Sequence, residues 1–230
     1  MEKSRFNANK GDVLLVQRVE RIWIKTDPHI SNYCHVAKNL YNETNYVIRQ
    51  WFFKHGEWLR YTALNWLLKD IKQSENYKQL PAQTAQQTLR QLESNWKGFF
   101  AAIKDWKKHP DKYPGRPKLP NYLKKNGEFL LLFTNQQVKL KDGYIHFPRK
   151  TGLRLKTRLP DSTNVSGARI VPKGTGYIVE IIYKKDVPPL KMQANRIAGI
   201  DPGMDNLVTL VNNTGKVPVV IKGKKIKSLN

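Results

Sequence analysis

A proline-rich segment near the middle of the chain separates two regions with different residue patterns. Residues 109–120 read HPDKYPGRPKLP, and the four prolines and one glycine in this stretch rule out a helix there. Before the segment, apolar residues recur mainly at spacings of three and four. After it, short apolar runs alternate with turn residues. The sequence therefore predicts an α+β protein.

The region before the segment is predicted to contain a strand region followed by a helical unit. Residues 12–25, DVLLVQRVERIWIK, carry short apolar runs with β-branched residues, which indicate one or two strands. Ser31 is predicted as the N-cap of an amphipathic helix whose apolar face extends to Trp51. A second helix is predicted over about 56–71, and a third begins near Pro81.

The region after the segment is predicted to form a small β-barrel or sandwich. Its short apolar stretches, separated by turn signals such as KDG and KGTG, are FLLLFT, QVKL, GYIHFP, LRLKTRL, ARIVP and YIVEIIYK. Residues 186–193 are predicted to be a linker. Beyond them, IAGID, NLVTLV and VPVVI predict an antiparallel meander, with Asp201 at the tip of its first strand.

The charge of the chain indicates which partners it binds. Forty-one Lys and Arg against eighteen Asp and Glu give a net charge of +23, so a polyanionic partner is expected. Residues 107–158 carry fourteen of the cations and three acids, a net +11, and a phosphate backbone is predicted to follow this region. The alternatives are a basic protein whose lysines only solvate it, or a ribosomal or chromatin role.

Several classes of protein are excluded by the same sequence. Cys34 is the only cysteine, which rules out a disulfide framework and a four-cysteine zinc site. The first residues lack the apolar core of a signal peptide, and no apolar run reaches the length of a membrane span, so a cytoplasmic protein without a membrane partner is expected. The five histidines show no metal-ligand spacing.

Several stretches of the chain occur in the order of a known family. They are CHVAKNLYNETNYVIRQ, LPAQTAQQTLRQL, YPGRPKLPNYLKK, PKGTGYIVEIIY, and GIDPGMDNLVTL with the following NNTGK and GKKIKSLN. Together they resemble the transposon-associated insertion-sequence OrfB/TnpB family, which are RNA-guided DNA endonucleases of prokaryotes and relatives of type V CRISPR effectors. The match runs from about residue 31 to the C-terminus, and Pro202 departs from the aliphatic residue that is usual at that position.

The resemblance implies an oligonucleotide-binding-like β-barrel with an inserted helical recognition unit, followed by the first strands of an RNase H-like (RuvC) domain. The implied parts are the first barrel strand or strands (1–30), the helical unit (31–109), the basic connector and barrel (110–192), and an incomplete nuclease domain (193–230).

Asp201 would be the first of three acids that bind Mg²⁺ for catalysis in this family. The family's other acids and its zinc ribbon are missing, so the chain alone is expected to lack nuclease activity, as a truncated form or a naturally shortened relative. An Asp before Pro-Gly is also a common turn cap, and similar strand turns occur in actin-like sugar kinases, which have no use for a charge of +23.

Three groups of residues are predicted to contact nucleic acid. Asn and Gln can pair with adenine, and Arg or Lys with guanine or phosphate. The resemblance adds that two helices read a motif beside the DNA target, through Lys38, Asn42, Asn45, Arg49, Gln83, Gln87 and Arg90. The expected backbone contacts to guide RNA or heteroduplex are Lys118, Lys124, Lys125, Lys139, Arg149, Lys150, Arg154, Lys156 and Arg158. The stacking candidates are Tyr122, Phe129, Tyr144 and Phe147, with core packing as the alternative for each of them.

The predicted function is guide-RNA binding and target-DNA recognition by the N-terminal portion of an RNA-guided DNA endonuclease. Two alternatives remain open. One is a nuclease-dead protein that only occupies DNA, and the other is a generic basic RNA-binding protein without guided targeting.

Overall fold

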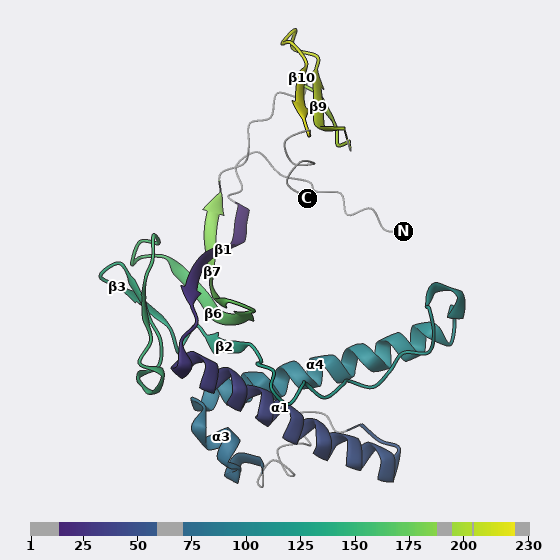
Figure 1. Ribbon diagram of the computed structural model, residues 1–230, viewed down its shortest axis with the longest axis vertical. Helices are drawn as coiled ribbons and strands as arrows, with labels where there is room; N and C mark the ends of the chain where they lie inside the picture. The colour runs from purple at the N-terminus through teal and green to yellow at the C-terminus, as the bar shows by residue number, and fades with distance from the viewer. Residues whose placement is uncertain (1–13, 59–70, 188–194, 204, 224–230) are drawn as a thin grey trace. The chain divides into compact units, whose positions relative to one another are not determined.

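The computed structural model describes residues 14–58, 71–187, 195–203 and 205–223 (Figure 1). The chain divides into two compact units. One is Leu15–Val187, and the other comprises Met1–Leu14 with Pro188–Asn230. Helices and antiparallel sheets occur together, which confirms the predicted α+β class.

The first helix, α1 (Pro28–His55), begins three residues before the predicted N-cap. The Asp27 carboxylate accepts hydrogen bonds from the amides of His29 (2.8 Å) and Ile30 (3.0 Å), and Pro28 occupies the first helical turn. Ser31 is therefore not the cap, and its hydroxyl donates to Glu128 instead (2.5 Å). The apolar face predicted from the sequence is confirmed, because its residues as far as Ile48 are buried. Gly56 ends the helix in the left-handed conformation, at φ 68°.

The helices that follow differ in part from the expectation. Most of the helix predicted over 56–71 lies outside the described residues. A short helix that periodicity did not indicate, α3 (Glu75–Gln79), is capped by the Ser74 hydroxyl. The predicted third helix is confirmed as α4 (Ala82–Trp106), which starts directly after Pro81. Within the described residues, none of the helices combines the length and apolar character needed to cross a bilayer.

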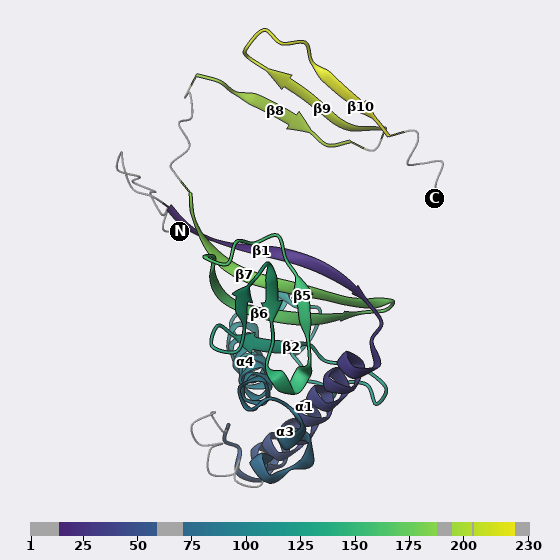
Figure 2. The ribbon, with the colours of Figure 1, turned by 90° about the vertical axis from the view of Figure 1, so that its left-hand side faces the viewer.

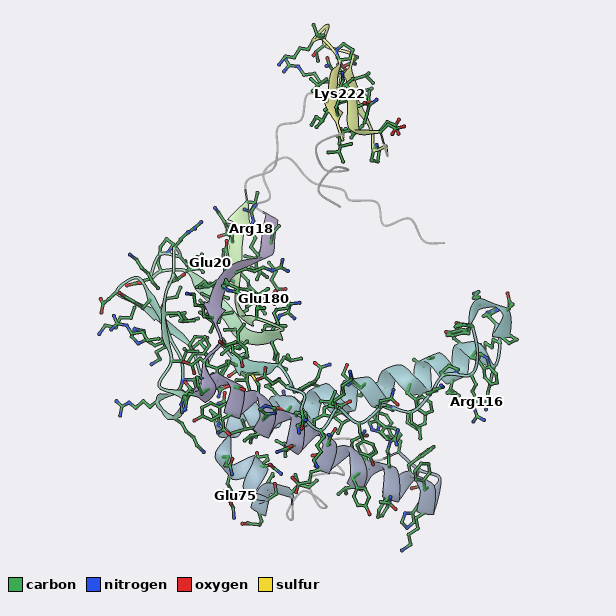
Figure 3. All side chains as sticks on the ribbon, in the orientation of Figure 1. Arg18, Glu20, Glu75, Arg116, Glu180 and Lys222 are labelled. Atoms are coloured by element: carbon green, nitrogen blue, oxygen red, sulfur yellow. The ribbon has the colours of Figure 1, made fainter. Side chains whose placement is uncertain are left out.

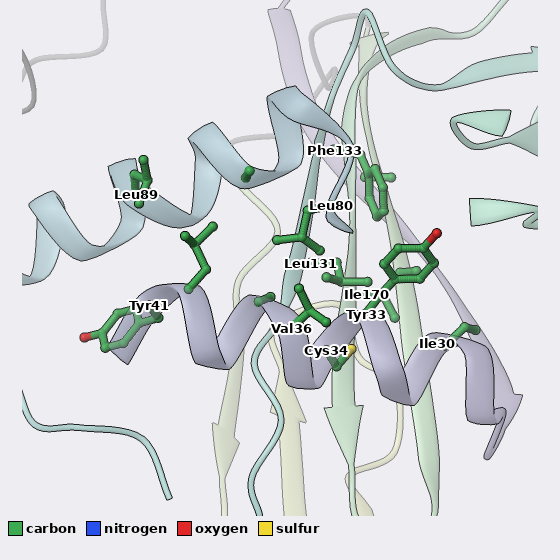
Figure 4. Close-up of a cluster of buried hydrophobic side chains, with 14 of the residues drawn as sticks. Ile30, Tyr33, Cys34, Val36, Tyr41, Leu80, Leu89, Leu131, Phe133 and Ile170 are labelled. Atoms are coloured by element: carbon green, nitrogen blue, oxygen red, sulfur yellow. The ribbon is translucent and has the colours of Figure 1, made fainter. Parts of the chain in front are cut away.

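A four-stranded sheet packs one face against α1 and α4. Its strands lie in the order β1 (Leu14–Lys25), β7 (Gly176–Val187), β6 (Asn164–Lys173) and β2 (Leu131–Thr134). Figure 4 shows Leu131, Phe133 and Ile170 of the sheet beside Tyr33 and Val36 of α1, all of them buried. Burying each such side chain contributes roughly 1.5–3 kcal/mol to folding.

Gly176 allows strands β1 and β7 to approach closely. A Cβ atom at this position would lie 2.4 Å from the carbonyl oxygen of Ile24, so any larger residue would push β1 away from its neighbour.

The remaining strands of this unit form a small separate sheet. It contains β3 (Lys139–Lys141), β4 (Tyr144–His146) and β5 (Arg154–Lys156), and β4 pairs antiparallel with both neighbours. The short 3-10 helices η1 (Pro110–Lys112) and η2 (Arg149–Thr151) lie in the connections.

The described strands do not form the predicted closed barrel. Closure would require a backbone ladder between the edge of the four-stranded sheet and the small sheet. Instead, the Glu20 carboxylate of β1 accepts hydrogen bonds from the Thr157 hydroxyl and from the Arg158 amide (3.0 Å). A side-chain bridge joins the two sheets where a barrel would have paired strands.

The second unit contains the predicted antiparallel meander, with strands β8 (Ala198–Asp201), β9 (Asn206–Asn212) and β10 (Val219–Lys222) (Figure 2). The Asn213 side chain accepts from the Ile197 amide (2.8 Å) and donates to the Asn195 carbonyl (2.7 Å), which fixes the start of β8.

We expect Asn45→Ala to destabilise the first unit by about 1–3 kcal/mol. Asn45 is fully buried, accepts from Trp96 Nε1 (3.1 Å) and donates to the Pro120 carbonyl (3.1 Å), so its removal leaves the buried Trp96 N–H without a partner and the Pro120 carbonyl with Arg49 as its donor. Urea denaturation of the full chain measures the change.

Asn39→Ala is the matched control, because Asn39 is an exposed asparagine on the same helix. It should change stability only within the range of helix propensity, under about 0.7 kcal/mol. Equal effects of the two substitutions would contradict a structural role for Asn45.

Candidate nucleic-acid interface

The connector, residues 109–125, comprises the proline-rich segment and the five residues after it. Its end, residues 120–125, lies along α1 and is held there by side chains of that helix. Asn42 binds Leu123 on both sides, donating to its carbonyl (3.0 Å) and accepting from its amide (2.8 Å). One turn earlier, the ammonium of Lys38 donates to the Lys125 carbonyl (2.6 Å) although Lys38 is only 5% exposed. These bonds fix the direction of the connector backbone.

The same helix face continues the contact through its next two turns. Asn45 and Arg49 both donate to the carbonyl of Pro120, at 3.1 and 2.9 Å. The Arg49 guanidinium also lies 4.7 Å from the centre of the Tyr122 ring, an attractive cation–π contact. The polar stripe of α1 therefore has an internal partner that the sequence analysis did not anticipate, and DNA contact by these four side chains stays a prediction.

The polar stripe predicted on α4 is only partly engaged. The Gln83 amide accepts from the Thr134 hydroxyl and donates to Gln136 Oε1 (3.1 Å), which ties the helix to the end of β2. Gln87 is half-buried and Arg90 is exposed. Base reading by these three side chains also stays a prediction.

The connector carries the first predicted phosphate contacts. Lys118, Lys124 and Lys125 are exposed, while the carbonyls of Pro120, Leu123 and Lys125 bond to α1. These hydrogen bonds hold the backbone between the lysines, so the three positive charges lie on a segment that is attached to α1.

The small sheet presents three of the six remaining predicted cations on one face, namely Lys139, Arg154 and Lys156. One row across the three strands consists of Lys139, His146 and Arg154. A second row, two positions further along the strands, consists of Lys141, Tyr144 and Lys156. Side chains alternate along a strand, so both rows project from the same face. The row between them, Leu140, Ile145 and Leu155, projects from the other face and packs against the core.

We call this surface the basic face, defined by Lys139, Lys141, Tyr144, His146, Arg154 and Lys156. Its four Lys and Arg side chains are exposed. The Arg154 guanidinium lies 3.8 Å from the centre of the Tyr144 ring, which holds a cation over an aromatic surface. Across the part of the chain that the structure describes, no carboxylate lies within ion-pair distance of these four cations.

Two members of the basic face were missed from the sequence. Lys141 and His146 were not chosen, although Lys141 lies two positions after Lys139 and strand alternation places both on one face. Pairing of His146 with the two chosen cations depends on register, which the sequence did not reveal.

The other predicted backbone contacts differ in accessibility. Arg149 and Arg158 are exposed. Lys150 instead donates its ammonium protons to the carbonyls of Lys78 and Leu80 (3.3 Å for the latter), which ties η2 to the segment containing α3.

The stacking candidates differ in their exposure, and Phe129 and Tyr144 are half-buried. Phe147 is 7% exposed and packs edge-on against Phe133 with ring centres 4.9 Å apart, which favours core packing, the alternative to base stacking. Continued alternation after β4 places Phe147 on the same side as the buried Ile145. Tyr122 is 44% exposed, so stacking by it stays a prediction.

Asp201 ends strand β8, opposite Thr209 of β9, and is exposed. Two-metal phosphodiester cleavage needs several carboxylates around ions roughly 4 Å apart. Among the described residues, no group of three or more His, Cys, Asp or Glu side chains could hold a metal ion. The described residues therefore do not form the Mg²⁺ site that the resemblance implies, and Asp201 supplies a single carboxylate.

Comparison with solved structures finds a similarity to a chain of the cryo-EM structure of the Cas12f1-sgRNA-target DNA complex, at 11% sequence identity and a TM-score of 0.43. The overlap covers 87% of this chain and 50% of that one, so this chain spans about half the length of that protein. No family profile and no curated protein matches the sequence.

We expect Asn42→Ala to loosen the connector. The loss of two hydrogen bonds to Leu123 should speed exchange of its amide hydrogen by roughly tenfold, since about 1.4 kcal/mol of local stability corresponds to that factor. Hydrogen–deuterium exchange measured by mass spectrometry over the connector tests this. Asn39→Ala should leave the exchange unchanged, and unaltered protection in Asn42→Ala would show that the connector is held by other means.

Proposed function

We propose that this chain is the nucleic-acid-binding portion of an RNA-guided DNA endonuclease of the TnpB type, which binds a guide RNA and recognises target DNA. The observation that carries the proposal is the basic face, on which exposed cations in register flank an aromatic ring. Several stretches of the sequence resemble the OrfB/TnpB family and occur in the same order as in that family. This resemblance specifies the expected polyanionic partner as a guide RNA and its target DNA.

The chemistry of the basic face suits a sugar–phosphate backbone. Lysines and arginines on the outer strands attract phosphates, and displaced counterions add a favourable entropy. Tyr144, on the central strand, offers a ring against which a base or ribose can pack. The buried reverse side, with Ile145 fully inaccessible, keeps the small sheet rigid, so the cations are already positioned before the ligand arrives.

The nuclease part of the proposal rests on Asp201 as one acid of a metal site. The acid at the end of β8 is exposed, so additional carboxylates and Mg²⁺ could reach it. The described residues do not supply those carboxylates. We therefore expect the 230-residue chain to bind nucleic acid without cleaving it.

The proposed binding surface can be tested through the salt dependence of RNA affinity. Lys139→Gln combined with Arg154→Gln removes two cations from the basic face, and the slope of log K against log salt should fall by about 0.7 for each lost contact with single-stranded RNA. Fluorescence anisotropy at several salt concentrations provides the slope.

The matched control is Lys54→Gln combined with Lys104→Gln, which removes the same charge from exposed positions on α1 and α4. Its slope should stay close to that of the unaltered chain. Equal slopes for the two double variants would favour diffuse attraction by the net charge.

Sequencing of RNA that co-purifies separates the alternatives, because guided function requires one defined RNA species and a generic RNA-binding protein gives a broad mixture.

Cleavage provides a second test. We expect no Mg²⁺-dependent DNA cleavage by the purified chain, because one aspartate cannot hold two metal ions. An assay with linear and supercoiled DNA checks this. Cleavage that Asp201→Ala abolishes would show that the chain completes a metal site by itself.

A further inference from the structure

A buried carboxylate lies between two arginines on the face of the four-stranded sheet opposite the helices. Glu180 of β7 has a side chain that is 7% exposed, and Arg169 faces it across the strand pair in register. The Arg169 Nε donates to one carboxylate oxygen, and the Arg21 Nε of β1 donates to the other (2.9 Å). Figure 3 labels Glu180 on this sheet. The three residues form a row across β1, β7 and β6, which we call the Arg–Glu–Arg row.

The row keeps its carboxylate ionised. Burial raises the pKa of Glu180, but the hydrogen bonds and charges of Arg169 and Arg21 outweigh burial and hold the pKa below its ordinary value of 4.5. At neutral pH the row therefore carries one negative and two positive charges. One arginine would suffice to neutralise Glu180, so the net positive charge left by the second arginine calls for a further explanation.

The geometry leaves most of each guanidinium available. A guanidinium has five N–H donors, and Glu180 uses the Nε–H of both arginines. Among the described residues, the other N–H groups of Arg21 and Arg169 have no recorded acceptor. Their side chains are 70% and 43% exposed, so a ligand in solvent reaches them. Glu180 thus fixes the orientation of both guanidinium planes and leaves their outer edges open.

A cavity of about 350 Å³ lies over this row. Lys173 lines it beside the two arginines, which brings three cations around one carboxylate. Its apolar lining consists of Leu130, Val171 and Ile178. An apolar lining strengthens the attraction between these cations and an anion, because it reduces the local screening by water.

We propose that this cavity binds a single phosphate group, with Arg21, Arg169 and Lys173 as its ligands and Glu180 as the residue that positions the arginines. Forked guanidinium donors match the paired oxygens of a phosphate, and a lysine adds a point charge. The phosphate belongs either to the backbone of a bound nucleic acid, in which case the site rests on the proposed function, or to free inorganic phosphate, in which case it does not.

The first test uses inorganic phosphate with the full chain. Arginine Nε–H signals in NMR spectra report binding at Arg21 and Arg169, and Arg21→Lys should weaken phosphate affinity by about tenfold or more while keeping the charge. Arg21 is exposed, so this substitution does not disturb the core. Arg18→Lys is the matched control, because Arg18 is an exposed arginine on the same strand as Arg21, and it should leave phosphate affinity unchanged.

Glu180→Gln distinguishes positioning from simple attraction. The substitution makes the cavity more positive by one charge, so attraction alone would strengthen phosphate binding. Loss of the oriented guanidinium groups should instead weaken it. Circular dichroism and thermal melting identify any unfolding of this variant, and Arg21→Lys supplies the test independently if Glu180→Gln unfolds.

The second test adds single-stranded RNA. Displacement of phosphate by RNA, together with weaker RNA binding by Arg21→Lys, assigns the site to a nucleic-acid phosphate. Phosphate binding that RNA does not displace assigns it to the free anion. Phosphate that leaves the arginine signals unchanged, or that binds Glu180→Gln more tightly, overturns the proposal. Since the basic-face variants are measured separately, a failure here leaves the proposed function intact.

Discussion

The fold of the first unit depends on the contact between helix α1 and the proline-rich connector. Prolines lack an amide donor, so this connector cannot pair as a regular strand and leaves carbonyl groups that need donors. The side chains of Lys38, Asn42 and Asn45 supply those donors at spacings of four and three along one helix face. Asn45 also accepts from the buried Trp96 of α4, so a single amide joins both long helices to the connector. The segment that interrupts the helical pattern of the sequence is thereby built into the helical unit.

The placement of the charged side chains explains how the first unit stays compact in a chain with a net charge of +23. Self-repulsion grows when like charges share a buried region, so the cations must be directed outward while apolar side chains fill the interior. On the small sheet, alternation achieves this directly, because Leu140, Ile145 and Leu155 face the core and their neighbours face solvent. In the four-stranded sheet, Glu180 offsets part of the charge of Arg21 and Arg169. In the small sheet, the cations therefore lie on a face whose opposite side packs against the hydrophobic core.

Local sequence patterns predicted most of the helices and strands. The contacts between these elements depend on residues that are far apart in the sequence, and the patterns did not predict them. The faces of α1 and α4, the strands after the connector and the C-terminal meander follow from periodicity and turn residues over a few positions. The contact of Asn42 with Leu123 spans 81 positions, and a polar stripe suited to bases looks the same in sequence as one suited to a backbone. Likewise, the Glu20 bridge between the two sheets spans 138 positions to Arg158. The basic face was found in part, since its cations are visible in the sequence but its register is not.

The meander shows why one short segment can be both a structural element and the carrier of an acid. In register, Ile200 faces Leu210, which faces Val219, and this row projects from one side of the sheet. Asp201 follows Ile200 and therefore projects from the opposite side, in a row with Thr209 and Val220. Ile200 is 63% exposed and Val219 is 52% exposed, whereas a stable sheet buries its apolar face against another layer. Because the two rows lie on opposite faces, a layer that covers Ile200 can stabilise the sheet without covering Asp201. A carboxylate at this position is carried at the end of a strand and is exposed to solvent.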